Sequence, residues 1–124
     1  MSEQRIEIIA KKRPSSVTQR VLTDAQASGL RVVGVSPSQE KAEEHARLLR
    51  TGWVAEAWLR LKRQGAPLPE HDLLIVDDAH KLSDEDLRAL IADEPEVKIL
   101  AYPPTRGGAF LLELVGKHGL RTIA

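Results

Sequence analysis

The sequence has no cysteine, few aromatic residues and no formal net charge. Without cysteine, its 124 residues can form neither disulfides nor thiolate metal sites, which is compatible with a reducing cytosol. Aromatic residues make up only 3% of the chain, so a folded core must be built mainly from Leu, Val, Ile and Ala. The 18 basic and 18 acidic residues cancel, which removes any whole-molecule charge argument for nucleic-acid binding and leaves only local patches.

Long apolar segments are also missing. No apolar run approaches the roughly 20 residues of a membrane-spanning helix, and the N-terminal segment has no apolar core of a signal peptide. We therefore expect a cytoplasmic protein without membrane insertion. The length suits one domain, and the 42% hydrophobic and 29% charged residues are typical of a folded globular chain. The sequence predicts a single domain over residues 1–124.

Short apolar runs alternate with segments of helical periodicity. Strands are predicted at Arg5–Ala10, Leu30–Val35, Asp72–Asp77 and Val97–Tyr102, with a short last one at Leu120–Ile123. Helices are predicted from Ser15-Ser16 to Gly29, from Gln39, over Val54–Gln64, from Ser83 with a cap to Asp86, and over Ala109–His118. Four consecutive apolar residues before Asp77 indicate a strand buried on both faces, as in a parallel sheet. The alternation predicts an α/β fold, a doubly wound parallel sheet with helices on both faces.

Functional loops of such a sheet lie at the carboxyl ends of its strands. Taken in order, these loops resemble the motifs of a RecA-like (P-loop NTPase-like) domain of superfamily 1 helicases, in particular the helicase region of TraI-type conjugative relaxases. Residues 6–29 stand where that family has a strand, a phosphate-binding loop and a helix ending in glycine. Residues 33–38 are similar to its DNA-contacting Ala-Pro-Thr-like element, residues 77–79 to its Asp-Glu-Ala motif and residues 107–110 to its Gly-Gly-x-Phe turn. The resemblance covers nearly the whole chain and implies a three-layer RecA-like fold.

Departures from that family predict that ATP hydrolysis is absent. The degenerate phosphate loop consists of Lys11, Lys12, Arg13, Ser15 and Ser16, with Pro14 between them. It has no glycine whose backbone N–H groups could surround phosphates. In the degenerate Walker B motif, Asp77 could still hold magnesium through water, but Asp78 stands where the family has a longer catalytic Glu. The residues that sense the γ-phosphate are replaced within 101–106, so we expect no catalytic residue, no cofactor and no metal site.

The resemblance implies that the domain binds single-stranded DNA without turning over nucleotide, as vestigial helicase regions do. The residues expected to contact DNA are Ser36, Ser38, Tyr102, Thr105 and Arg106. A helix N-terminus after Ser38 suits a phosphate, and a base stacked on Tyr102 would contribute about 1–3 kcal/mol. The family also implies type IV secretion or relaxosome proteins as partners in plasmid transfer. Because a full helicase has two such domains, it implies that this chain is a piece of a longer relaxase or helicase.

Other interpretations stay open at this point. The acidic pair at 77–78 could simply cap the following turn, the basic run at 11–13 could be a solvated loop, and Tyr102 could be packed. The four histidines lack metal-ligand spacing. Residues 73–78 also resemble a response-regulator strand, which points to a receiver-like or pseudo-receiver domain, but receivers carry the acidic pair after their first strand and here it follows the third predicted one. A plain protein-interaction domain of the same fold would bind neither DNA nor nucleotide.

Overall fold

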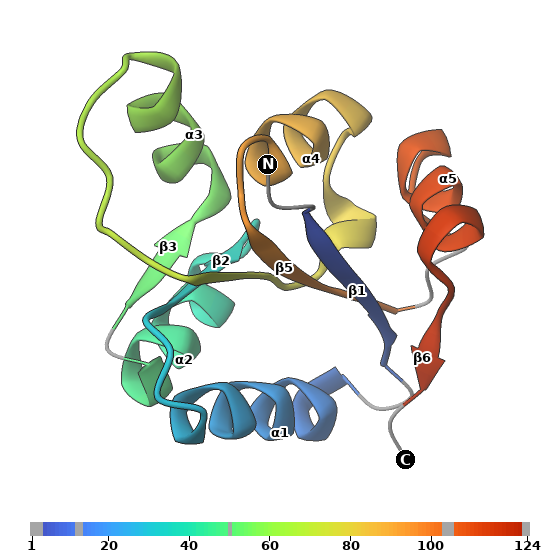
Figure 1. The fold of residues 1–124 in the computed structure, drawn as a ribbon, viewed down its shortest axis with the longest axis horizontal. Helices are drawn as coiled ribbons and strands as arrows, with labels where there is room; N and C mark the ends of the chain where they lie inside the picture. Colours follow the sequence, from blue (N-terminus) through green and yellow to red (C-terminus); the bar gives the residue numbers. More distant parts are fainter. Residues whose placement is uncertain (1–3, 12–13, 50, 103–105, 123–124) are drawn as a thin grey trace.

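The structure, a computed structural model, describes residues 4–11, 14–49, 51–102 and 106–122, except for the side chains of residues 14–16. Within these residues it is a single α/β domain with one six-stranded sheet and five α-helices (Figure 1). The elements are β1 (Arg5–Ala10), α1 (Pro14–Ala27), β2 (Val32–Ser36), α2 (Gln39–Leu49), β3 (Gly52–Val54), α3 (Ala55–Arg63), β4 (Leu73–Val76), η1 (Ala79–Lys81), α4 (Asp84–Ile91), β5 (Glu96–Ala101), α5 (Ala109–His118) and β6 (Arg121–Thr122).

The sheet has the strand order β3-β2-β4-β5-β1-β6, and every neighbouring pair is parallel. In Figure 1, α1 and α2 lie on one side of the sheet, and α3, α4 and α5 lie on the other. This is a three-layer arrangement of the RecA-like or Rossmann type, so the predicted fold class is confirmed. Because all strands are parallel, the residues that follow β1, β2, β4 and β5 meet at one edge of the sheet.

The sheet is buried by a separate apolar cluster on each face. On one face, Val17, Val21 and Leu22 of α1 pack on Ile9 and on neighbouring strand residues. On the other, residues of α3, α4 and α5 pack around the fully buried Trp58. All four residues of β4 are buried, which confirms the prediction of a strand covered on both sides. No helix among the described residues has the length and apolar character needed to cross a membrane.

The helix boundaries follow the capping chemistry. Ser83 caps α4 as predicted, since its Oγ accepts a hydrogen bond of 3.1 Å from the N–H of Asp86. Helix α1 begins at Pro14, before the predicted Ser15-Ser16 start, and proline suits a first helical position because the N–H there has no partner within the helix. At the other end of α4, Lys62 Nζ donates to the carbonyls of Ala89 and Ala92, at 2.7 and 2.8 Å.

One strand is absent from the sequence prediction. Residues 52–54, predicted as a break and a helix start, form the edge strand β3 beside β2. Three residues are too few to show the alternation of a strand, so no periodicity marked it. Gly52 is required there, because a Cβ at this position would collide with the backbone of α2 at Ala42 and Ala46. As a result, the acidic pair at 77–78 follows the fourth strand and not the third.

His71 and Glu94 join the two loops that precede β4 and β5. The Nε2 of His71 lies 2.6 Å from Oε2 of Glu94, and its Nδ1 lies 2.8 Å from the carbonyl oxygen of Pro69. A carboxylate and a carbonyl only accept, so both ring nitrogens act as donors and the imidazolium form fits best. The hydrogen bond to Glu94 outweighs the loss of hydration and raises the pKa of His71 above its usual value. The same ring packs edge-on against Trp58, with centroids 5.6 Å apart.

Replacing Gly52 by alanine should destabilise the domain by about 1–3 kcal/mol, because the added methyl group meets backbone atoms of α2 that cannot turn aside. Gly116 provides the matched control, since it lies in α5 with open space where a Cβ would stand. Gly116→Ala should instead stabilise the domain by roughly 0.5–1 kcal/mol through helix propensity. Urea unfolding of both variants measures the difference, and equal effects would contradict this account of β3.

The His71–Glu94 pair should make stability fall as the pH rises. A folded-state pKa raised above 6.5 means that this contribution is complete below pH 6.5 and is lost as the pH rises through the raised value. The difference in unfolding free energy between the wild type and His71→Gln should therefore shrink over that interval. His118→Gln, at an exposed site on α5, is the matched histidine substitution outside this pair. A pH-independent difference for His71→Gln would rule out the charged pair.

Candidate functional site

A buried lysine occupies the carboxyl edge of the sheet. Lys11 follows β1, and its side chain has no solvent exposure. It passes the end of β5 to reach β4, where its Nζ forms an ion pair with Oδ1 of Asp77 and lies 3.1 Å from Oδ1 of Asp78. The position of Lys11 is fixed by the main chain, because its N–H donates to the carbonyl of Ala101 at 2.9 Å. Lys11 therefore lies neither in a solvated loop nor on a surface that could touch a DNA phosphate.

Asp77 is the centre of this cluster and accepts from four groups. Its Oδ1 binds the Lys11 ammonium, the N–H of Asp78 at 2.9 Å and the hydroxyl of Thr18 at 3.4 Å. Its Oδ2 lies 3.1 Å from Nε2 of His45, which must be the donor because a carboxylate only accepts. Three of these donors share Oδ1 and one uses Oδ2, so Oδ1 is fully occupied by groups of the chain itself.

His45 also belongs to this cluster. It lies on α2, is fully buried and packs over Gly34 of β2, where any side chain would collide with the imidazole ring. Its Nδ1 is buried without a hydrogen-bond partner among the described residues. The close approach of helix and strand needs the glycine, and it brings the ring within reach of Asp77.

Asp78 has an unusual backbone conformation. Its φ is 51°, in the left-handed region that aspartate tolerates better than most residues. This turn ends β4 and starts η1, and the Asp78 side chain makes no capping hydrogen bond to that helix. Its carboxylate instead turns toward Lys11, so the interpretation of Asp78 as a helix cap is wrong for the side chain.

Electrostatics favour the ionised form of Asp77. Burial alone would raise its pKa, but the hydrogen bond from His45 and the charge of Lys11 outweigh this loss of hydration and lower the pKa below 3.8. The cluster therefore combines one cation with carboxylates in a space closed to solvent. Within the described residues, no group of three or more acidic, histidine or cysteine side chains is arranged to hold a metal ion.

The residues expected to contact DNA are dispersed. Ser36 is fully buried, and its Oγ accepts from the N–H of Ser38 at 3.2 Å. Ser38 in turn accepts from the N–H of Lys41 and so caps α2. Both hydroxyls thus have structural partners, and that of Ser36 is not at the surface.

Tyr102 and Arg106 do lie at the surface of this edge. Tyr102 is 42% exposed, and its N–H donates to Nδ1 of His80 at 3.0 Å. Burial lowers the pKa of His80, which keeps the ring neutral and able to accept. Arg106 is exposed. The predicted DNA contact Thr105, and Lys12 and Arg13 of the degenerate phosphate loop, lie outside the described residues, as do the side chains of Ser15 and Ser16.

The Gly-Gly-x-Phe turn has a packing explanation. A Cβ on Gly108 would collide with the carboxylate of Asp84, and one on Gly107 would collide with Leu111. The Asp84 carboxylate accepts from the N–H of Phe110 at 3.2 Å and so satisfies the first turn of α5. The guanidinium of Arg88 lies 4.4 Å from the centre of the Phe110 ring. This motif therefore joins α4 to α5.

Sequence reasoning did not find Thr18 or His45. Both lie on helices, and their spacing along the sequence marks each of them only as another buried or another polar position. His45 stands three residues after Ala42, the other buried position of α2, and this periodic placement was the available signal.

Removing the Lys11 ammonium should lower the free energy of unfolding more than removing an ordinary surface ion pair does. Lys11→Met leaves Asp77 and Asp78 without their cation and should destabilise the domain by about 3–5 kcal/mol. The lowered pKa of Asp77 means that its contribution to wild-type stability is present above pH 3.8 and is lost as the pH falls through the folded value, so the difference in unfolding free energy between the wild type and Lys11→Met should shrink over that interval. Lys41→Met, which removes a partly exposed pair with Glu44, is the control. A loss below about 1 kcal/mol for Lys11→Met would contradict the buried pair.

Comparison with models of known protein families finds no match, and comparison with curated proteins finds no significant match.

Proposed function

We propose that this chain is a non-catalytic, RecA-like binding domain in which internal ion pairs stand where nucleotide and magnesium would otherwise bind. The observation that carries the proposal is the buried Lys11 ammonium on Asp77 and Asp78. A phosphate-binding lysine must face an open loop, whereas this one is enclosed. A nucleotide would have to displace Lys11 and then approach two carboxylates.

The satisfied state of Asp77 supports the same proposal. Magnesium needs oxygen ligands with near-ideal octahedral geometry. The four donors around Asp77 come from the segment after β1, from α1, from α2 and from the turn after β4. Metal binding at Oδ1 would compete with three of these four contacts, so the expected loss of ATP hydrolysis remains the proposal that the geometry favours.

We further propose that the binding surface is the exposed part of the sheet's carboxyl end, around Tyr102. The proposed ligand is single-stranded DNA, and the proposed parent is a conjugative transfer protein. Tyr102 offers an exposed ring, with the exposed basic side chains of Lys81 and Arg106 on neighbouring segments. Single-strand binding typically combines such a stacking ring with cations that follow the backbone. The formal charge of zero limits the contribution of the rest of the molecule.

A protein partner is the second candidate, and helix α5 favours it. Leu112 and Leu120 are 47% and 45% exposed, on and just after a helix that is mostly apolar. Exposed apolar side chains of this size suit a protein interface, such as one with the secretion or relaxosome proteins. The pseudo-receiver alternative is less favoured, because the acidic pair follows β4 and both carboxylates already contact Lys11.

The test is a fluorescence-anisotropy titration of labelled oligo-dT at low and moderate salt. Tyr102→Ala and Arg106→Ala should each weaken binding, the former by about 5-fold to 100-fold if the ring stacks on a base. Arg60→Ala removes the same charge from α3, where the arginine pairs with Glu56 of its own helix, and should change little. Binding should weaken as salt rises.

Nucleotide is tested in parallel with a fluorescent ATP analogue and a phosphate-release assay in magnesium. We expect neither saturable binding nor release. Magnesium-dependent release that Asp77→Asn abolishes would overturn the non-catalytic proposal. Absence of oligo-dT binding at low salt would overturn the DNA proposal and leave the protein-interaction candidate.

A further inference from the structure

The amino half of β1 has an open edge. On one side, β5 pairs with β1 along its whole length, from Arg5 to Ala10. On the other side, in the part of the chain that the structure describes, β6 pairs only with Ile9 and Ala10. An edge of this kind exposes unpaired N–H and C=O groups and is a template for another strand.

Hydrogen bonds to β5 show which groups face the open side. The N–H of Arg5 donates to Pro95, and that of Lys11 donates to Ala101, both at 2.9 Å. Main-chain groups alternate sides along a strand, so the odd-numbered residues of β1 face β5. The N–H and C=O of Ile6 therefore point toward the open side. The N–H of Ile8 points the same way, but Ile8 is only 1% exposed, so Ile6 presents the accessible groups.

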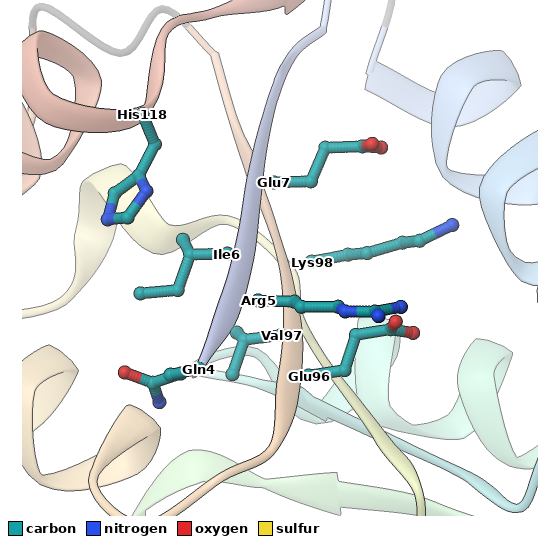
Figure 2. Close-up of a pocket in the computed structure, with 8 residues that line it drawn as sticks. All are labelled: Gln4, Arg5, Ile6, Glu7, Glu96, Val97, Lys98 and His118. Carbon is teal, nitrogen blue, oxygen red and sulfur yellow. The ribbon is translucent and has the colours of Figure 1, made fainter. Parts of the chain in front are cut away.

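The open side of β1 borders a hollow, and the two faces of the sheet present different side chains there. Figure 2 shows Gln4, Ile6, Val97 and His118 on one side of the two strands, and Arg5, Glu7, Glu96 and Lys98 on the other. These residues line a hollow of about 520 Å³. A second hollow of about 410 Å³ runs along residues 6–8 to the connection between α5 and β6.

We propose that the β1 strand of a second copy of this chain pairs antiparallel with this edge, giving a symmetric dimer with a continuous sheet. The local sequence Arg5-Ile6-Glu7 is complementary to itself. A two-fold axis at Ile6 places Ile6 opposite Ile6 and, twice over, Arg5 opposite Glu7. Within its own chain Oε1 of Glu7 already lies 3.2 Å from Nη1 of Arg121, so in the dimer this carboxylate would lie between that arginine and Arg5 of the other copy. Opposite charges on directly facing residues stabilise antiparallel pairs, and like charges destabilise them.

The register is selected by the main chain and by charge. Among the described residues the free main-chain groups belong to even-numbered positions, so the axis passes through one of them or through the odd-numbered residue between two of them. An axis at Arg5 or at Glu7 would place that charged side chain opposite its own copy, which is unfavourable. An axis at Ile8 would require pairing at Ile9 and Ala10, where β6 already lies. The axis at Ile6 instead uses residues 4–8, which is the open stretch, and it gives the isologous contact typical of two-fold dimers.

Sedimentation equilibrium of the 13.7 kDa chain should give twice this mass. Ile6→Pro removes the N–H at the axis and should give a monomer, while Ile6→Ala keeps the N–H with a comparable loss of side chain and should still dimerise. Thermal unfolding of each variant checks that the monomer is folded. A wild type that stays monomeric up to about 1 mM, or an Ile6→Pro variant that dimerises like it, would overturn the proposal.

Charge reversal tests the register. Arg5→Glu alone and Glu7→Arg alone each place like charges opposite one another twice, so each should weaken dimerisation about tenfold or more. In an equimolar mixture of the two variants, every facing pair is again of opposite charge, so a heterodimer should form. If the mixture stays as monomeric as its components while the wild type dimerises, this interface is wrong.

Discussion

The ion pairs between Lys11 and the two carboxylates after β4 determine the carboxyl edge of this domain. A buried ammonium is costly unless fully paired, and two buried carboxylates are costlier still without a cation. Each part of the arrangement therefore depends on the others. Helix α2 must approach β2 closely enough for His45 to reach Asp77, and this approach requires Gly34. The turn after β4 takes a left-handed residue so that Asp78 also faces the lysine.

The fold was largely predictable because its signals are local. Runs such as Leu73–Val76 show burial directly, and a serine three residues before an acidic one marks a helix start. β3 escaped prediction because its three residues are held by packing against α2 and by pairing with β2, neither of which leaves a repeat in the sequence. Topology brought together segments that lie far apart along the chain.

The sequence indicated where the site lies but not that its side chains pair with one another. The strand ends drew attention to Lys11, Asp77 and Asp78 as separate motifs. That they satisfy one another depends on the strand order, which places β5 alone between β1 and β4. Sequence spacing cannot reveal that a lysine in a basic run is buried, since charge runs are usually solvated. The glycines at 107 and 108 illustrate the reverse case, in which a family-like motif is accounted for by close packing.

The neutralisation of Asp77 by donors from four parts of the chain also constrains how this sequence can change over time. No single substitution frees a carboxylate for a metal without leaving a buried charge or an unsatisfied donor behind. A substitution that removes Lys11 or His45 in order to free a carboxylate for a metal would therefore begin with a less stable protein. The buried cluster therefore opposes changes at its own residues, while selection can still alter the exposed surface around it.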